Sequence, residues 1–535
     1  MKRFNGIALS VAFCSLASQA ALAQTKIDTL KVQHLNEVIV KGVRAAKEAP
    51  YAVANIRKSE LKQFSCSGQE LPFLLSRTPG ILAWSENGIG TGTTYMRIRG
   101  AAGSRINVTL DGVALNSPED QTVFWANMNS YSSLLGSIQV QRGVGSSTNG
   151  DGAFGGSISM ATAAPSLTPT AEVTGSFGSY NTYHTGASFS TGLLGKHLIF
   201  DGAYHETATD GYVDGTAGRS GSYYGGLTWL GDNFKVSYKN IGNFEKTGQA
   251  WNGVLGGDYN SNFTLLQDGI RTYKDMYKAG LDKFNVLTGD LVRNGKGDYT
   301  VTPYTLRDGS KWDKTTDNFY QNHNILSATW TPGSHWSHSL SLHYTYGYGY
   351  YKEFKNNAKF AKFGLVYKDA EGNKVKKSDF IRKKGLTQHT YGMVYNTNYK
   401  DEHWDVIGGL NLQQFRGNHW GYLTYIANQD AEKKFFGSNG KYKYYDSDAH
   451  KYDYSAFVKA SYRFADYWNA FADLQYRRVE YKTDGINDKF IALKDGSYKN
   501  QELNINEKYN FFNPKAGISF NKDGHKAYAS VAYSN

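Results

Sequence analysis

Side chains of opposite character alternate along one stretch of this 535-residue chain. From Trp336 to Tyr350 the even positions hold Trp, His, Leu or Tyr, while the odd positions hold Ser, His, Thr or Gly. Successive residues of a β-strand point to opposite faces, so this period of two predicts a strand with one apolar face. An ordinary strand has about 5–6 residues, whereas a tilted strand that crosses a membrane needs about 9–11. The stretch therefore predicts a membrane-spanning strand that continues beyond the bilayer.

Similar alternation recurs from residue 166 to residue 535, which predicts a partial transmembrane β-barrel. Short turn signals separate many of these stretches: Gly231-Asp232-Asn233, Pro332-Gly333, Asp401-Glu402, Ala465-Asp466 and Lys522-Asp523-Gly524. The other connections are expected to be long loops: Gly248–Thr315, Lys352–Gly385, Tyr422–Lys451 and Lys482–Lys508. We expect roughly thirteen or fourteen strands of about ten or more residues each. Because a barrel has no free edge, we expect the chain to be a fragment that lacks its C-terminal strands.

The composition supports strands and excludes membrane helices. Mean hydropathy is −0.53, yet the chain has 40 Tyr, 28 Phe and 10 Trp, residues that favour strands and interfacial girdles. After the first residues no run of about 18 apolar residues occurs. The net charge is +12 without a concentrated basic region, so no nucleic-acid partner is expected.

The N-terminus has the pattern of an export signal, predicted to span residues 1–23. Lys2 and Arg3 precede an apolar stretch, and Ala21-Leu22-Ala23 offers a cleavage site before Gln24. Removal of Lys2 and Arg3 takes the net charge from +12 to +10. Of the 2 Cys, only Cys66 remains after cleavage, which excludes an intramolecular disulfide.

Two regions that differ in composition and residue pattern follow the signal. Residues 24–50 form a polar arm whose string Leu35–Val40 is prone to β structure, either as an ordinary first strand or as a peptide that adds to a partner's sheet edge. Residues 51–165 predict a compact α/β domain. Its helix is expected over Gln69–Arg77, ended by Pro79-Gly80, and its strands over Tyr95–Arg99, Asn107–Leu110, Ser137–Gln141 and Gly156–Ala161.

Four motifs within this domain occur in a definite order. They are Arg97-Ile98-Arg99-Gly100, Asn107-Val108-Thr109-Leu110-Asp111-Gly112-Val113, Ile138-Gln139-Val140-Gln141-Arg142-Gly143, and Gly150-Asp151-Gly152-Ala153-Phe154-Gly155-Gly156-Ser157-Ile158-Ser159. The series resembles the plug domain of TonB-dependent outer-membrane receptors. The resemblance implies a mostly β fold in which a small α/β plug fills an antiparallel barrel of about 22 strands. It also implies that Glu37, Val38, Ile39 and Val40 form a TonB box.

The resemblance assigns roles to several plug residues. Arg97, Arg99 and Arg142 are expected to dock the plug on wall carboxylates, because an unpaired charge inside a lumen is costly. Turn roles are expected for Gly100, Asp111, Gly112, Gly143, Gly155 and Gly156. Gly150, Gly152 and Gly155 match GxGxxG, but a strand pattern rather than a helix follows, which argues against a nucleotide site.

Residues between the plug strands, on the side away from the arm, are candidates for contact with a ligand. They are Trp84, Glu86, Asn87, Tyr95, Gln121, Phe124 and Trp125. Aromatic and amide side chains suit a bulky amphipathic ligand, although Phe124 and Trp125 are equally explained by packing against the wall. The ten Lys and one Arg of Lys352–Lys384 could attract anionic ferric siderophores, bind lipopolysaccharide, or simply be solvated.

The resemblance implies active import into the periplasm, powered through TonB with ExbB and ExbD. The expected cargo is a metal chelate, above all a ferric siderophore, with haem, cobalamin and other nutrient complexes as alternatives. The chain is expected to be a monomer in outer-membrane lipid and lipopolysaccharide. The 13 His are scattered and no HExxH or Gly-x-Ser-x-Gly motif occurs, so no enzyme, bound metal or cofactor is expected. A passive porin and a barrel enzyme are the alternatives from other classes.

Overall fold

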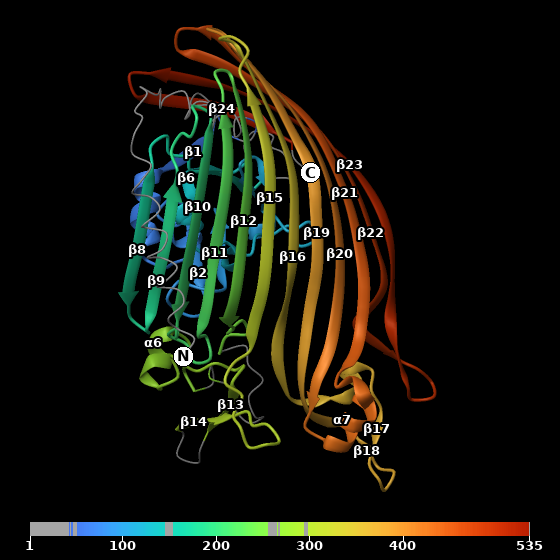
Figure 1. Cartoon of the computed structure of the whole chain (residues 1–535). Helices are drawn as coiled ribbons and strands as arrows, with labels where there is room; N and C mark the ends of the chain where they lie inside the picture. The colour runs from blue at the N-terminus through green and yellow to red at the C-terminus, as the bar shows by residue number, and fades with distance from the viewer. Residues whose placement is uncertain are drawn as a thin grey trace.

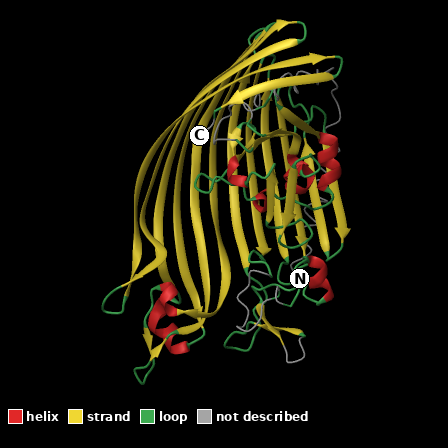
Figure 2. Ribbon diagram, turned by 180° about the vertical axis from the view of Figure 1, so that it is seen from behind, coloured by secondary structure: helices red, strands yellow, loops and turns green. Residues whose placement is uncertain are grey.

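A computed structural model describes residues 42, 44–45, 51–144, 154–254, 265, 268–293 and 298–533. A large curved antiparallel sheet dominates the molecule, and a small domain lies in its concavity (Figure 1). Figure 2, seen from behind, shows the helices of this domain on the concave side. No helix of the described residues is both long and apolar enough to cross a membrane.

The large sheet has 13 strands, and each pairs with its neighbours in chain order. The strands are β8 (Thr170–Gly178), β9 (Thr182–Ser190), β10 (Leu198–Thr209), β11 (Gly218–Leu230), β12 (Phe234–Gly248), β15 (Thr316–Trp330), β16 (Trp336–Lys359), β19 (Lys377–Lys400), β20 (Trp404–Ile426), β21 (Tyr442–Ala465), β22 (Trp468–Ala492), β23 (Tyr498–Lys522) and β24 (His525–Ala532). The predicted fold class and strand number are therefore confirmed. All five predicted short turns join neighbouring strands at one end of the sheet.

The two faces of β16 meet different surroundings, as its alternation predicts. Leu342 and Tyr344 on the outer face are exposed, whereas Ser341 and His343 on the inner face are buried. Polar side chains of β16 thus face the concave side, and aliphatic and aromatic ones face outward.

Three of the four predicted long loops are shorter than expected, because their ends belong to strands. Strand β16 continues to Lys359 and β19 begins at Lys377, inside the stretch predicted as a loop from Lys352 to Gly385. The same holds for Tyr422–Lys451 and Lys482–Lys508. Backbone hydrogen bonds continue there, but the side-chain alternation weakens, so the sequence pattern does not mark these strand ends. The prediction of loops over these ends was wrong.

Folded pieces lie at the end of the sheet with the long connections, at the bottom of Figure 1. Between β12 and β15 these are α6 (Tyr273–Lys278), β13 (Gly289–Arg293) and β14 (Tyr299–Pro303). Between β16 and β21 they are η4 (Phe360–Phe363), β17 (Tyr367–Lys368), β18 (Lys374–Val375), α7 (Gln429–Phe436) and η5 (Gly437–Asn439). Phe360, Phe363, Phe380 and Phe436 belong to a buried cluster that joins two of these connections. The packed side chains of this cluster show that these long connections are folded against each other and are not separate solvated loops.

The small domain has a five-stranded sheet in the order β1-β6-β7-β4-β5, plus a hairpin. Its elements are β1 (Ala52–Arg57), α3 (Lys58–Ser65), α4 (Leu71–Leu75), the hairpin β2 (Ile81–Ser85) and β3 (Thr94–Ile98), η2 (Gly103–Arg105), β4 (Ile106–Leu110), β5 (Val113–Ala114), η3 (Trp125–Met128), α5 (Tyr131–Leu134), β6 (Leu135–Arg142) and β7 (Gly156–Thr162). All four predicted strands are present. Helix α4 is shorter than the predicted Gln69–Arg77, and α3 was not predicted.

Helix α3 buries Leu61 and Phe64 beside the sheet residues Val140 and Ile158 in one apolar core. The strand β7 follows the GxGxxG stretch, as expected for a packing role rather than a nucleotide site. A Cβ at Gly155 would lie 2.6 Å from the Cβ of Ala101, so only glycine fits between these backbones. Gly150 and Gly152 lie outside the described residues.

Candidate functional site

One buried ion pair joins the small domain to the large 13-stranded sheet, which we call the wall. Asp111 follows β4 in a left-handed conformation (φ 50°), and Gly112 continues the turn at φ 83°. The Asp111 carboxylate accepts hydrogen bonds of 2.9 Å from both the amide and the hydroxyl of Thr162. Lys239 on β12 donates to it at 2.6 Å. The residue predicted as a turn thus also holds the domain to the wall.

The surroundings of Asp111 favour its charged form. Burial alone raises the pKa of this carboxyl, but the charge of Lys239 and the bonds from Lys239 and Thr162 outweigh that effect. The net result is a pKa below its ordinary value. The sequence offered no signal for this pair, because the partners stand 128 positions apart.

A second contact joins the segment 117–122 to the opposite part of the wall. Glu119 accepts a hydrogen bond of 2.8 Å from the Tyr481 hydroxyl, and its other oxygen lies 2.7 Å from His419 Nε2. Lys451 donates to the Pro118 carbonyl at 2.7 Å. Burial raises the pKa of Glu119, but the bond and charge of His419 and the Tyr481 bond lower it overall. No motif in the sequence marks Glu119 as a contact residue.

The three arginines predicted to dock the domain make their described contacts within it. Arg142 donates to the Pro79 carbonyl at 2.8 Å, and Arg97 donates to the Gly100 carbonyl at 3.2 Å. Arg99 occupies a left-handed position (φ 49°). Their pairing with wall carboxylates stays a prediction. The buried pair of Asp111 with Lys239 has the opposite polarity, with the carboxylate on the domain. An exposed pair of the predicted polarity uses a lysine instead, because Lys62 on α3 lies 2.8 Å from Glu172 on β8.

The predicted turn residues cluster near the strand ends. Positive φ angles occur at Gly100, Gly112, Gly143 and Gly156. At Gly156 a Cβ would also lie 2.7 Å from the Gln141 carbonyl oxygen. Their conformations are those that side chains other than glycine rarely adopt.

The hairpin β2–β3 brings three of the ligand candidates together. The rings of Trp84 and Tyr95 stack with centroids 5.4 Å apart. Tyr95 donates its hydroxyl to Glu86 at 2.6 Å, and Glu86 also accepts from the Ala250 amide at 2.8 Å. Burial raises the pKa of Glu86. This hairpin therefore meets the start of the long connection after β12.

Asn87 and Gln121 support the backbone of the domain. Asn87 is buried, and its amide group donates to Thr91 at 2.6 Å. The backbone amide of Gln121, at φ 56°, donates to the Ser117 carbonyl at 2.8 Å. Contact of either side chain with a ligand stays a prediction.

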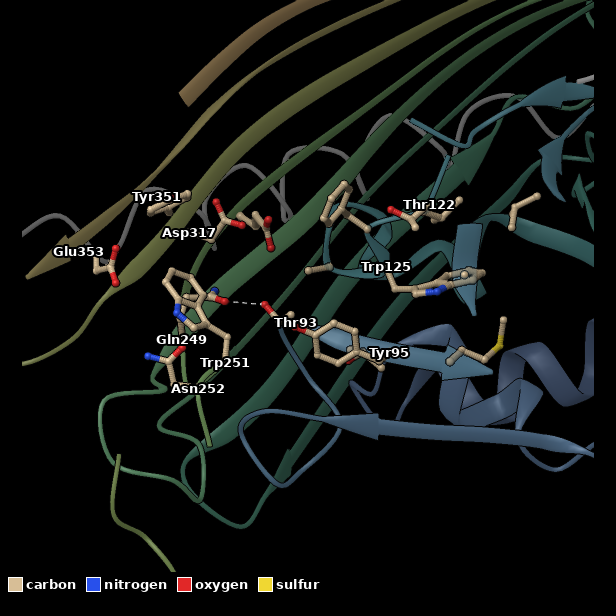
Figure 3. Close-up of a pocket in the computed structure, with 18 of the residues that line it drawn as sticks. Thr93, Tyr95, Thr122, Trp125, Gln249, Trp251, Asn252, Asp317, Tyr351 and Glu353 are labelled. Atoms are coloured by element: carbon tan, nitrogen blue, oxygen red, sulfur yellow. Dashed lines mark hydrogen bonds between the residues drawn. The ribbon is translucent and has the colours of Figure 1, made fainter. Parts of the chain in front are cut away.

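A cavity of about 560 Å³ opens between the domain and the wall (Figure 3). Tyr95, Phe124 and Trp125 line it from the domain, so the structure brings these three candidates into one site. The wall and the connection after β12 contribute polar and aromatic residues that the sequence analysis did not identify: Glu245, Gln249, Trp251, Asn252, Asp317, Tyr351, Glu353, Lys355 and Arg382. Its size suits a small-molecule site.

A second cavity of about 420 Å³ adjoins the first. Phe124, Glu245, Asp317 and Tyr351 line both cavities. Charged residues occur at many inward-facing positions of the strands, Lys239, Lys451 and Lys459 among them, so charge alone does not mark this lining in the sequence.

Part of the charge in the first cavity is already paired. Glu353 forms ion pairs with Arg382 at 2.9 Å and with Lys355. Lys384 pairs with Asp488 at 2.7 Å. Several cations of the Lys352–Lys384 stretch are therefore engaged with carboxylates, and attraction of an anionic ligand by this stretch stays a prediction.

Comparisons with known proteins identify the small domain. Residues 45–157 match the family described as TonB-dependent Receptor Plug Domain. No curated protein sequence matches the chain significantly.

Solved structures match over nearly the whole chain. The open form of the ferric-catecholate import receptor Fiu from E. coli K12 matches with a TM-score of 0.64 and 12% identity, over 92% of this chain and 70% of that one. The ferric yersiniabactin uptake receptor FyuA from Yersinia pestis matches with a TM-score of 0.60 and 12% identity, over 90% and 64%. The copper transporter OprC matches with a TM-score of 0.61 and 11% identity, over 91% and 65%. The chain thus spans about two thirds of the length of these structures.

Proposed function

We propose that this chain, which has the plug domain and the fold of the TonB-dependent receptors, belongs to an outer-membrane receptor that imports a bulky ligand. Residues 1–23 would direct its export, residues 24–50 would form the arm, residues 51–165 the plug, and residues 166–535 part of the barrel. Energy would come from TonB, with ExbB and ExbD, because no nucleotide is available outside the inner membrane.

The way in which the plug is held carries this proposal. Its contacts with the wall include hydrogen bonds and ion pairs at Asp111 and Glu119, beside a limited apolar contact with Ile241 on β12. Polar contacts of this kind can be broken and remade in water, unlike a shared apolar core. A passive porin has no need of a separate domain docked in this way.

The end of the arm lies where a periplasmic partner could reach it. Lys459, close to the short-turn end of β21, donates to the Gly42 carbonyl at 2.7 Å. The Ala45 amide donates to Gln139 on β6 at 2.7 Å. We expect Glu37, Val38, Ile39 and Val40, which precede Gly42 and lie outside the described residues, to pair with TonB by strand addition.

The ligand is proposed to be a metal complex, with a ferric siderophore favoured. Two of the similar structures carry names of ferric-complex receptors and one that of a copper transporter. Haem, cobalamin and other nutrient complexes are the alternatives. The cavity lined by Tyr95, Phe124 and Trp125 is the proposed place of contact.

Growth of a deletion strain tests the proposal. The strain is supplied with ferric siderophores, haem or cobalamin as alternative sole sources, and is complemented by the intact gene or by Ile39→Pro. Proline removes a backbone donor and fixes φ, so strand addition to TonB should fail. We expect ligand binding to the cells to persist and growth to be lost. Unchanged growth of the Ile39→Pro strain would contradict the TonB-box assignment.

A further inference from the structure

Two wall carboxylates face the cavities without a cation of their own. Glu245 on β12 and Asp317 on β15 both line the two cavities. The pairing of Thr247 with Asp317 makes Glu245 and Asp317 diagonal neighbours on the inner face of the sheet. They place two acidic groups side by side at the junction of the cavities.

Neither carboxylate takes part in an ion pair among the described residues. The two cations that line the first cavity, Lys355 and Arg382, are both bound to Glu353. Glu245 is only 7% exposed, and its Oε2 has no hydrogen-bond partner. Burial of a carboxylate oxygen without a donor is costly, so a further positive or donating group at Glu245 Oε2 would be stabilising.

Aromatic rings surround the same space. Trp125 and Phe124 approach from the plug, while Trp251 and Tyr351 approach from the wall side, as Figure 3 shows for the two tryptophans and the tyrosine. Aromatic faces attract cations, and they do so most strongly where water is excluded. Carboxylates flanked by aromatic rings are therefore suited to an organic cation.

The geometry points to a cation-selective subsite, in which Asp317 and Glu245 bind an ammonium or guanidinium group of the ligand between the plug and the wall. This inference rests on the proposed import function and narrows its substrate class. The favoured cargo is a complex or nutrient with a pendant organic cation, rather than one that presents only anionic groups to the cavity. Glu86, which accepts hydrogen bonds from the Tyr95 hydroxyl and the Ala250 amide, is a further acidic residue of the same region.

Three soluble probes of similar size test the inference on the full chain in an uncharged detergent. They are benzyltrimethylammonium, uncharged N-benzylacetamide and anionic 3-phenylpropanoate, each titrated by saturation-transfer NMR. We expect the cation to bind at least about tenfold more tightly than the other two. In the Asp317→Asn, Glu245→Gln double variant this preference should disappear.

A matched variant controls for a general loss of inner-face charge. Asp201→Asn removes a carboxylate that accepts from Tyr224 on the same wall and lines neither cavity, so it should keep the full preference. Thermal unfolding of each variant verifies that the fold is retained, and the single Asp317→Asn variant replaces the double one if the latter is unstable. Equal binding of the three probes, binding of none, or a preference that survives the substitutions would overturn the inference.

The two experiments distinguish the proposed receptor function from the proposed cation subsite. If growth on a metal complex still requires an intact Ile39 but does not change in the Asp317→Asn, Glu245→Gln strain, import is supported and the cation subsite is rejected. If the cation preference is found but growth is insensitive to Ile39→Pro, the subsite stands and coupling to TonB is rejected.

Discussion

Single residues decide how firmly the plug is held. Asp111 is buried, and its charge is balanced by Lys239 from a strand of the wall. Removing one partner of a buried pair leaves the other charge unbalanced, which costs about 3–5 kcal/mol. The pair therefore matters to the docked plug mainly because loss of either partner would leave the other as a buried, unbalanced charge.

Replacing Lys239 by Met should loosen the plug without unfolding the wall. The Thr162 amide donates to Asp111, so its hydrogen exchange reports on this contact. We expect exchange at Thr162 to accelerate by about 100-fold, which corresponds to about 3 kcal/mol. Lys400→Met is the control, because the Lys400 side chain is 61% exposed in its pair with Asp405. A surface pair contributes less than about 1 kcal/mol.

The same contact should depend on pH. Because the pKa of Asp111 is lowered in the docked state, the pair stabilises docking at pH values above the ordinary value of 3.8. That contribution is lost as the pH falls through the lowered pKa. The difference in Thr162 exchange between the native chain and Asp111→Asn should therefore be largest at neutral pH and disappear in strong acid. A constant difference down to strong acid would contradict the assignment.

Individual strands show which sequence patterns carry structural information. Alternation predicted β16 and its two faces, and turn residues such as Pro332-Gly333 predicted the short connections, because both depend on local backbone geometry and solvent. The strand extensions past Lys352 were missed, because their side chains alternate less clearly although the backbone pairing with neighbouring strands continues. The helix α3 was missed because its eight residues carry too short a pattern.

A charge on the outer face of β16 should test the lipid contact. Leu342 is 46% exposed, and Leu493, in the turn between β22 and β23, is 45% exposed. We expect Leu342→Arg to lower the free energy of unfolding in lipid by about 2–4 kcal/mol. Leu493→Arg, beyond the bilayer, should change it by less than about 0.5 kcal/mol. Urea titration of both variants in vesicles measures the difference, and equal effects would refute the placement of β16.

At the scale of the whole molecule, the plug and the wall form one structure joined by separable contacts. Import through such a structure requires the plug to move or to rearrange. An ideal Cβ at Gly92, on the plug hairpin, lies 3.6 Å from the Cβ of Thr247 on β12. Two cysteines at this spacing can form a disulfide.

A disulfide between plug and wall should block import but leave binding intact. In a Cys66→Ser background, which removes the exposed free thiol, Gly92→Cys with Thr247→Cys should lose uptake when oxidised and recover it with a reductant. The controls are the single variants Gly92→Cys and Thr247→Cys, neither of which can form this disulfide, and both should import in either state. The measurement is the uptake of the metal complex that supports growth, divided by the amount of that complex bound to the cells. If the oxidised Gly92→Cys, Thr247→Cys variant still takes up the complex, the contact between these two positions need not open during import.

The sequence by itself determined the β class, the two faces of the strands, the short turns and the order of the plug motifs. These features depend on neighbours along the chain, on backbone conformation and on the solvent at each face. Only the tertiary structure decided that Asp111 pairs with Lys239, that Glu119 contacts His419 and Tyr481, and that Glu245 and Asp317 share a cavity with Trp125. Those partners come from distant parts of the chain, and their pairing is set by how the plug is seated in the sheet.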